Sequence, residues 1–264
     1  MRVESLTIIG GGNMGAALAQ GVLRSGLVPR SLTIVEVSES RRVALAEMFP
    51  DSRIVSAIES CDRVVVAVKP PDVAAAVTEA VRHGARSVVS IAAGISLSAL
   101  SRAAGPGVAV VRAMPNTPSL VGEGAAAFAL GAECDAATAA LAAEVLGGVG
   151  LAVEVDEDQL DAITGLTGSG PAYLFYVAEA LVAAGVAEGL EPAMVEQMVR
   201  QLFLGAGTLL ARSPESPARL REMVTSPGGT TAAGLGVLAQ HGVSDAFVAA
   251  VRAATARSVE LGAD

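Results

Sequence analysis

The chain has 264 residues and a formal net charge of −9, and 52% of its residues are hydrophobic although only 3% are aromatic. It carries no basic stripe, which argues against a nucleic-acid partner. Two long uncharged stretches, 162–178 and 223–240, are interrupted by glycine and proline. Because a spanning helix needs about 20 continuous apolar residues, we expect no membrane helix and interpret the chain as cytoplasmic.

Residues 5–155 alternate short β-branched runs with segments of helical period. This alternation is typical of a parallel sheet with helices on both faces. The expected strands are 6–9, 32–37, 53–55, 64–68, 88–91 and 108–113, with 124–130 and 151–155 as two further candidates.

From residue 156 the β-branched runs disappear, and the pattern is helical to the end of the chain. Pro171 and Pro192 suit first helical turns, and Ser244 suits an N-cap. Two of the segments, 172–188 and 231–238, are apolar nearly all the way round, so part of their surface should meet a second subunit. The expected helices are 172–188, 192–212, 216–224, 231–240 and 244–261.

A glycine-rich turn follows the first expected strand. Gly10, Gly12 and Gly15 form Gly-x-Gly-x-x-Gly, with Asn13 and Met14 between the last two. The first glycine permits a tight turn, the second lets a pyrophosphate approach the backbone, and the third lets helix and strand pack closely. The N–H groups at the helix start then face the phosphates. We therefore predict an α/β chain with a Rossmann-like, dinucleotide-binding parallel-sheet domain over 1–155, followed by an all-α substrate-binding and dimerisation domain over 156–264.

Glu36 ends the second expected strand, where an acid would bond the adenosine ribose hydroxyls. A carboxylate there would repel a 2′-phosphate, which favours NADH slightly over NADPH. Val37 and Ser38 complete the expected contact segment. However, Ser38, Arg41 and Arg42 could serve a phosphate, unless the two arginines are only a solvated helix face.

Further small or proline-bearing turns follow the fourth, fifth and sixth expected strands. Open parallel sheets bind ligands beyond the carboxyl ends of their strands, so these turns should contact the nicotinamide and its ribose. Lys69 is the only lysine of the chain, although a single lysine is usually a surface charge. The expected contacts are Ala67, Val68, Lys69, Pro70, Ala92, Ala93, Gly94 and Asn116.

The segment Ser226-Pro227-Gly228-Gly229-Thr230-Thr231 lies between two expected helices. Its backbone N–H groups and hydroxyls could hold a carboxylate, although Ser226 or Thr230 could instead act only as a helix N-cap. The helical half contains no lysine. A 2-hydroxyacid dehydrogenase would need such an acid or base, whereas reduction of a protonated imine needs less.

Neither a metal site nor a disulfide is expected. Cys61 and Cys134 lie far apart in the sequence, and the chain has only two histidines. This spacing is typical of two buried free thiols.

Taken together, these motifs resemble the pyrroline-5-carboxylate reductase family, with departures at Thr167, Glu36 and Val37. The departure at Glu36 and Val37 puts the NADPH preference usual in that family in doubt. The matching pieces are Gly10–Gly15, Ala67-Val68-Lys69-Pro70, Ser90-Ile91-Ala92-Ala93-Gly94, Arg112-Ala113-Met114-Pro115-Asn116-Thr117-Pro118, Gly168-Ser169-Gly170-Pro171-Ala172-Tyr173, Glu215-Ser216-Pro217 and Val224-Thr225-Ser226-Pro227-Gly228-Gly229-Thr230-Thr231.

The resemblance implies reduction of (S)-1-pyrroline-5-carboxylate to L-proline by hydride transfer from NADPH or NADH, the last step of proline biosynthesis. It implies that Thr231 bonds the ring nitrogen as the catalytic residue. It also implies a homodimer with interlocked helical domains, often five such dimers in a ring. The substrate contacts that it implies are Ser226, Gly228, Gly229, Thr230, Thr231 and Glu215. A related imine or 2-hydroxyacid reductase and a non-catalytic NAD(P)H-sensing protein remain alternatives.

Overall fold

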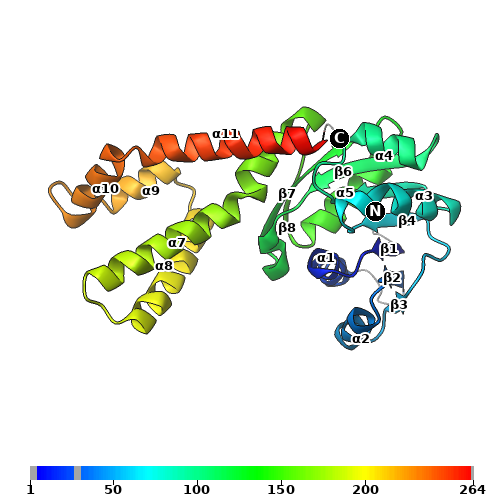
Figure 1. The fold of residues 1–264 in the computed structure, drawn as a ribbon, viewed down its shortest axis with the longest axis horizontal. Helices are drawn as coiled ribbons and strands as arrows, with labels where there is room; N and C mark the ends of the chain where they lie inside the picture. The colour runs from blue at the N-terminus through cyan, green and yellow to red at the C-terminus, as the bar shows by residue number, and fades with distance from the viewer. Residues whose placement is uncertain (1–4, 27–30, 263–264) are drawn as a thin grey trace. The chain divides into compact units, whose positions relative to one another are not determined.

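The computed structural model describes residues 5–26 and 31–262, and the chain forms two compact units. The first unit comprises Met1–Ser169 together with Arg252–Asp264, and the second comprises Gly170–Val251. These packing units divide the chain later than residue 155, because the segments on either side of the second unit both pack on the sheet of the first. Figure 1 shows the sheet and the helices with their labels.

The first unit is built on one sheet with the strand order β3-β2-β1-β4-β5-β6-β7-β8. The order reverses direction between β1 and β4, which creates the switch point where such sheets bind ligands. Every predicted strand is present, with ends that differ by at most two residues. The strands are β1 Leu6–Ile9, β2 Leu32–Val35, β3 Arg53–Val55, β4 Arg63–Val66, β5 Ser87–Ser90, β6 Ala109–Met114, β7 Gly124–Leu130 and β8 Gly150–Glu154.

One strand pair departs from the parallel sheet that we predicted. β6 and β7 are antiparallel, whereas the other neighbouring strands run parallel. The link between the two strands is only residues 115–123, and it contains the short 3-10 turn Thr117–Val121 followed by Gly122 with φ 80°. A parallel connection needs a crossover of a dozen or more residues, so this short link reverses the chain instead.

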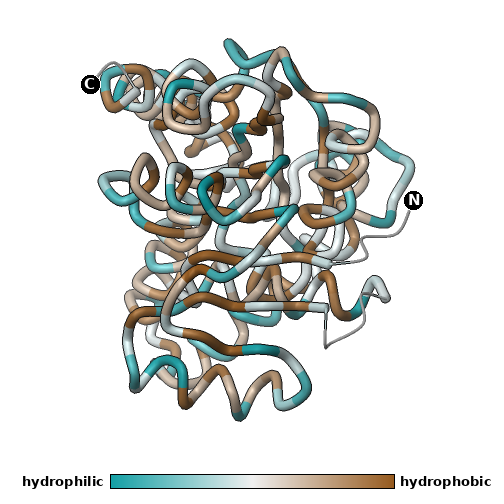
Figure 2. Tube along the Cα trace, turned by 90° about the vertical axis from the view of Figure 1, so that its right-hand side faces the viewer, coloured by the Kyte–Doolittle hydropathy of each residue, from teal (hydrophilic) through white to brown (hydrophobic). Residues whose placement is uncertain are grey.

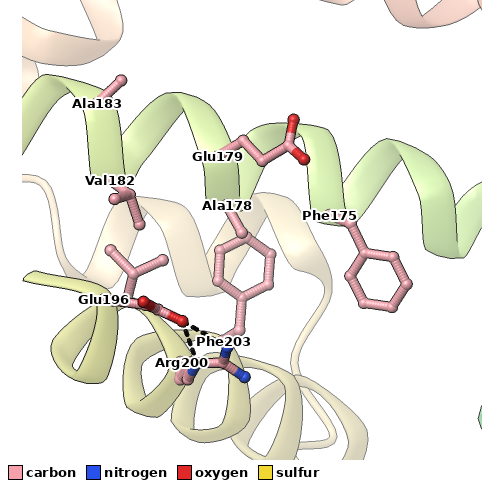
Figure 3. A pocket seen from close by; sticks show the side chains of 9 residues that line it. Phe175, Ala178, Glu179, Val182, Ala183, Glu196, Arg200 and Phe203 are labelled. Atoms are coloured by element: carbon pink, nitrogen blue, oxygen red, sulfur yellow. Dashed lines mark hydrogen bonds and ion pairs between the residues drawn. The ribbon is translucent and has the colours of Figure 1, made fainter. Parts of the chain in front are cut away.

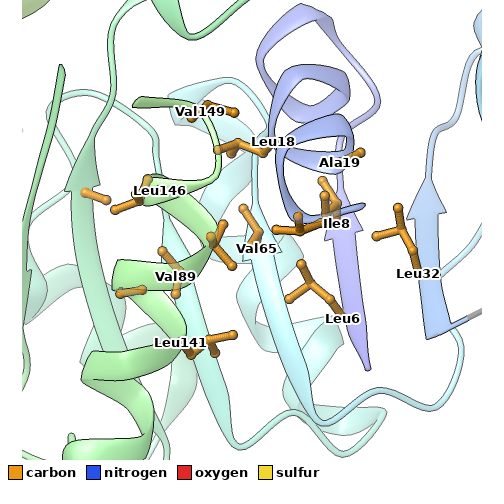
Figure 4. Close-up of a cluster of buried hydrophobic side chains, with 14 of the residues drawn as sticks. Leu6, Ile8, Leu18, Ala19, Leu32, Val65, Val89, Leu141, Leu146 and Val149 are labelled. Atoms are coloured by element: carbon orange, nitrogen blue, oxygen red, sulfur yellow. The ribbon is translucent and has the colours of Figure 1, made fainter. Parts of the chain in front are cut away.

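Helices cover both faces of the sheet, as the alternation of patterns predicted. Alternate strand residues face opposite ways, so Val65 packs under α1 and α5 while Val64 and Val66 pack under α3 and α4. Figure 4 shows the first of these clusters, in which Leu18 of α1 and Leu141 of α5 belong to the same group of side chains as Ile8 and Val65 of the strands. The helices of this unit are α1 Asn13–Arg24, α2 Glu39–Met48, α3 Val73–Arg82, α4 Leu97–Ala104, α5 Ala136–Gly147 and α6 Leu160–Ile163.

The stretch that leads from the first unit into the second corrects one expectation. We expected glycine and proline to break the helix here, but Glu157–Ala187 is continuous over 31 residues. The turn Thr164–Gly168 is π-helical, with Ser169 N–H donating to Thr164 O at 2.9 Å, and it absorbs the irregularity. Within the described residues this helix is long and apolar enough to cross a membrane, and the bent pair Thr230–Gln240 and Val243–Gly262 also passes if it is taken as one span. One or two such helices are weak evidence of a membrane segment.

The second unit consists of helices that pack on one another incompletely. The unit holds α7 Gly170–Ala187, α8 Pro192–Arg212, α9 Pro217–Met223, α10 Thr230–Gln240 and the start of α11 Val243–Gly262. Pro192 is the first residue of α8 and Pro171 the second residue of α7, so both stand in first turns as predicted. However, α7 continues the helical stretch that begins at Glu157, so the carbonyl of Thr167 precedes Pro171 within the same stretch. The prediction for Ser244 was wrong, because Ala246 N–H already donates to Gly242 O and the helix therefore starts earlier.

Large apolar side chains remain exposed throughout this second unit. All its residues are described, and only Val195 and Val199 among its hydrophobic residues are buried. Figure 2 shows hydrophobic stretches within helices as well as along the strands. The helices that were predicted to be buried are therefore not buried by this chain alone.

Candidate active site

The three glycines of the motif in the turn after β1 each fit their position for a different structural reason. Gly10 has φ 102°, and a Cβ on it would lie 2.5 Å from Ala67 O. A Cβ on Gly15 would overlap the Gly10 carbonyl oxygen. Nothing lies within 4 Å of the position of a Cβ on Gly12, so open space remains in front of the backbone there. Gly10 and Gly15 therefore serve packing, and Gly12 leaves room for a ligand.

The start of α1 is open to an anion. Gly12 is its N-cap, no side chain caps the helix, and its first turn contains no acidic residue. The first N–H groups of a helix have no partner inside the helix, and the helix dipole favours negative charge at this end. Asn13 is exposed in this turn, and Met14 is half-buried against the core. This end of α1 has the properties of a pyrophosphate site.

The Glu36 carboxylate bonds the glycine turn instead of pointing freely into solvent. Its Oε2 accepts from Gly11 N–H at 3.0 Å, and its Oε1 accepts from Ser38 N–H at 2.8 Å. Sequence reasoning missed Gly11, although the run of three glycines was a signal for it. A Cβ there would overlap Leu45 of α2. Glu36 thus joins the turn after β1 to the end of β2, and Val37 beside it is 84% exposed.

Arg41 and Arg42 are not the solvated helix face that we considered. Arg41 Nε donates to Gly11 O at 2.7 Å. Arg42 Nη1 donates to Glu36 O at 3.0 Å and to Val37 O at 2.8 Å. The Ser38 hydroxyl accepts from Arg41 N–H and caps α2. Both guanidinium groups therefore hold the backbone of this segment.

Two further predicted segments lie at the same edge of the sheet. Ala67 N–H donates to Ile9 O at 2.8 Å, which places the turn after β4 beside the glycine turn. In that turn Lys69 and Pro70 are exposed, whereas Ala67 and Val68 are half-buried. The turn after β5 has a buried Ala92, an exposed Ala93 and a half-buried Gly94 with φ 74°. The structure thus gathers four predicted segments, 10–15, 36–38, 67–70 and 92–94, at the carboxyl edge.

Asn116 follows β6, and its buried side chain already has two backbone partners. Its Oδ1 accepts from Ala125 N–H at 2.9 Å, and its Nδ2 donates to Thr167 O at 3.0 Å. Pro171 has no N–H to bond the carbonyl four residues before it, which is that of Thr167. Asn116 supplies the missing donor to the Thr167 carbonyl, so its side chain has a structural role. A contact with the cofactor stays a prediction.

The 226–231 segment lies in the second unit and opens α10. Gly228 has φ 71°, and a Cβ on Gly229 would overlap Ser226 Oγ. Gly229 is the N-cap of α10 and no side chain caps the helix, so the alternative of a simple cap by Ser226 or Thr230 was wrong. Thr230 and Thr231 are exposed in the first turn. Their hydroxyls and the helix N–H groups are available to an anion.

Glu215 is exposed immediately before α9, and its backbone N–H donates to Ser213 Oγ at 3.1 Å. The segment and Glu215 belong to the second unit, whereas the predicted cofactor residues belong to the first.

A cavity of ≈ 630 Å³ opens between α7 and α8, away from every predicted site residue. Figure 3 shows it, with Phe175, Val182 and Phe203 among the side chains that line it. The Glu196–Arg200 ion pair of α8 also lines this cavity. Its lining is mainly apolar, so it has little to orient a small polar substrate.

The two cysteines are free, as predicted, but each is half-buried and not buried. Burial raises the pKa of the Cys61 thiol. Burial also raises the pKa of the Cys134 thiol, although its backbone hydrogen bonds with Gly131 and Val110 act in the opposite direction. Among the described residues, no group of three or more His, Cys, Asp or Glu side chains could hold a metal ion.

The helical half of the chain matches a family model for the pyrroline-5-carboxylate reductase dimerisation domain over residues 157–261. Residues 5–94 match a model described as NADP oxidoreductase, coenzyme F420-dependent. Pyrroline-5-carboxylate reductase of Corynebacterium melassecola is 38% identical over 98% of this chain and 99% of its own length. The chain belongs to the pyrroline-5-carboxylate reductase family.

Solved structures of the pyrroline-5-carboxylate reductase family share the fold. The enzyme of Coxiella burnetii superimposes with a TM-score of 0.91 at 33% identity, covering 98% of each chain. The Plasmodium falciparum enzyme, solved with NADP bound, superimposes with a TM-score of 0.83 at 26% identity, covering 99% of each chain. The α/β sheet domain and the helical dimerisation domain predicted from the sequence are confirmed.

Proposed function

We propose that this chain reduces (S)-1-pyrroline-5-carboxylate to L-proline with NAD(P)H, as the last step of proline biosynthesis. The similarity to pyrroline-5-carboxylate reductases over nearly the whole chain carries this proposal. Two open helix starts, one at 12–15 and one at 229–231, add the chemistry of two anion sites. A related imine or 2-hydroxyacid reductase remains the second candidate, and the absence of lysine from the helical half argues against the hydroxyacid.

We propose that the start of α10 binds the substrate. The N–H groups and hydroxyls of Ser226, Gly228, Gly229 and Thr230 hold the carboxylate, with Glu215 nearby in sequence before α9. The Thr231 hydroxyl bonds the ring nitrogen and orients the C=N bond. A protonated imine already accepts hydride, so Thr231 or a water has only to keep the proton on that nitrogen. Positioning then supplies most of the rate.

The proposed cofactor residues are those gathered at the carboxyl edge of the sheet. When bound, the nicotinamide supplies the hydride. The start of α1 holds the pyrophosphate, Glu36 faces the adenosine ribose, and the 67–70 and 92–94 turns border the nicotinamide half. Asn116 is kept in this set as a neighbour of the same edge.

We propose NADH as the preferred cofactor. The Glu36 carboxylate is fastened by two N–H groups at the place where a 2′-phosphate would lie, so it cannot easily move away. Arg41 and Arg42 bond backbone carbonyls, which reduces their ability to offset that charge. Replacing Glu36 with Ser should therefore raise kcat/KM for NADPH relative to NADH. An unchanged ratio would contradict this role of Glu36.

We propose that the helical unit forms a homodimer, since its match is to a dimerisation domain and its apolar side chains are exposed in one chain. A ring of five dimers is the larger assembly that we propose, and a measurement of molecular mass in solution would detect it. We keep the division into domains 1–155 and 156–264, and a cytoplasmic location, as proposals.

Steady-state kinetics with pyrroline-5-carboxylate and each cofactor in turn test the function directly. Thr231→Ala removes one hydrogen bond to a charged group, worth about 1.5–3 kcal/mol, and should lower kcat/KM by roughly ten- to hundredfold. NAD(P)H affinity, measured by cofactor fluorescence, should stay near that of the wild type, and Thr231→Ser should recover activity. Equal losses of activity and cofactor affinity would refute the role of Thr231.

A further inference from the structure

A buried arginine in the sheet has partners that no part of the proposed chemistry uses. Arg112 on β6 is 8% exposed. Its Nη1 donates to Glu157 Oε1 at 3.3 Å, and its Nη2 donates to Asp161 Oδ1 at 2.9 Å. Glu157 and Asp161 stand four residues apart in one helical stretch, so both face the same guanidinium. A buried charge of this kind is retained only where it is fully paired.

The same carboxylates bind two other parts of the first unit. Ser258 Oγ of α11 donates to Asp161 Oδ1 at 2.7 Å, and this serine is 5% exposed. Leu97 N–H, at the start of α4, donates to Glu157 Oε1 at 2.7 Å. One guanidinium therefore joins β6, the start of α4, the α6 segment and the end of α11. We call Arg112, Glu157, Asp161 and Ser258 the Arg112 cluster.

The end of α11 also lies against one of the proposed cofactor turns. A Cβ on Gly94 would lie 3.1 Å from Leu261 O, and Leu261 is one turn after Ser258. The left-handed φ of Gly94 favours glycine, and the close approach of Leu261 leaves little room for a side chain. The position of α11 on the Arg112 cluster thus determines what borders the turn at 92–94.

The chain order gives the Arg112 cluster its importance. Asp161 precedes Gly170, where the second unit begins, and Ser258 follows Val251, where that unit ends. The segment that leads into the helical unit therefore bonds Arg112 through Asp161, and the segment that leads out of it bonds Asp161 through Ser258. The hydrogen bond from Ser258 to Asp161 links these two segments, although the residues are 97 positions apart in sequence.

We propose that Arg112, Asp161 and Ser258 are positioning residues for hydride transfer. The Arg112 cluster keeps the 92–94 turn and the two connecting segments in one geometry, so that the proposed nicotinamide edge is held rigid while the substrate is reduced. A misplacement of about 1 Å far from the reacting atoms can cost about a hundredfold in rate. The catalytic consequence rests on the proposed function; the rigidity of the cluster does not.

The test uses Ser258→Ala, which removes only the hydroxyl, and Asp161→Asn, which keeps the shape but removes the charge. Ser258→Thr restores a hydroxyl, and Asp158→Asn is the matched control, because Asp158 is exposed and lies in the same helical stretch. We expect Ser258→Ala to lower kcat about tenfold and Asp161→Asn about a hundredfold. NAD(P)H affinity should change little, since the glycine turn is untouched. Ser258→Thr and Asp158→Asn should behave as the wild type.

Amide hydrogen exchange is the second measurement, and it needs no turnover. We expect faster exchange over 92–97 and 252–262 in Ser258→Ala and Asp161→Asn, with exchange in β1 and α1 unchanged. Unchanged exchange and unchanged kcat in both variants would overturn the proposal. So would a parallel loss of kcat, cofactor affinity and thermal stability, which indicates a general structural defect. A wild-type chain that fails to reduce pyrroline-5-carboxylate would refute the proposed function, while the exchange data would still decide whether the cluster positions the turn.

Discussion

The sheet unit and the helical unit differ in how far one chain completes them. In the sheet unit, helices on both faces bury the strands, and side chains such as Ile8, Val65 and Val89 are fully buried. In the helical unit, side chains of similar size remain open, among them Phe175 at 66% and Met198 at 61%. A patch of this kind marks an interface. The sheet unit buries its core within one chain, whereas the helical unit leaves exposed the apolar side chains that the proposed homodimer would cover.

The largest effect that this comparison predicts is on assembly. Met198→Glu places a charge in each proposed subunit contact, which costs several kcal/mol when it is buried unpaired. The dimer dissociation constant should rise by about a hundredfold or more, with loss of activity. Sedimentation equilibrium measures this directly. Met48→Glu, a change at a 52% exposed methionine of α2 in the sheet unit, is the control. Equal effects of the two variants would remove the distinction between the units.

A smaller effect separates packing from ligand binding within the sheet unit. Gly15→Ala drives a Cβ into the Gly10 carbonyl and should lower the free energy of unfolding by about 1–3 kcal/mol. Gly12→Ala meets open space, so stability should change by less than about 0.5 kcal/mol. Both variants should weaken NAD(P)H binding. Thermal unfolding with and without cofactor measures both effects, and a strongly destabilised Gly12→Ala would contradict this assignment.

The smallest effect concerns one helix cap in each unit. Hydrogen bonds from Ala193 and Met194 N–H lower the pKa of Glu191 below its usual 4.5. Bonds from Thr138 likewise lower the pKa of Asp135 below 3.8. A lowered folded-state pKa stabilises the protein above the usual value, and this contribution disappears as the pH falls through the folded-state pKa.

Glu191→Gln and Asp135→Asn should therefore be slightly less stable than the wild type at pH 7, and the difference should shrink in acid. Urea unfolding at pH 7 and in acid measures this difference in stability. Glu188→Gln is the control, because Glu188 is an exposed residue of the link between α7 and α8. If the helical unit depends on a partner subunit, the Glu191 effect should also vary with protein concentration, whereas the Asp135 effect should not.

Local chemistry accounts for the features that the sequence predicted well. The strands of the sheet follow from β-branched runs, and α8 begins at Pro192 because proline fits a first turn. The glycine turn was predictable because each glycine meets a requirement of backbone conformation or close approach. The open start of α10 was only one of two alternatives, since a pattern does not show whether Ser226 caps the helix.

Long-range contacts decided the rest, because nothing in a local pattern records which distant groups meet. Arg41 and Arg42 bond backbone carbonyls that only the folded chain brings within their reach. The continuous helix through Pro171 depended on Asn116, which replaces the missing donor from 51 positions away. A lone arginine in the buried run 109–114 was a signal that sequence reasoning did not use, although a charge there demands partners.

The sequence by itself determined a dinucleotide-binding sheet, a helical half with too much apolar surface for one chain, and the family to which both belong. Only the tertiary structure decided that β7 runs antiparallel to β6, that Glu36 is tied to the glycine turn, and that Arg112 and Ser258 both bond Asp161. The reason is physical. Periodicity and glycine conformation act over a few neighbouring residues, whereas the pairing of buried charges and carbonyls is selected by the packing of the whole fold.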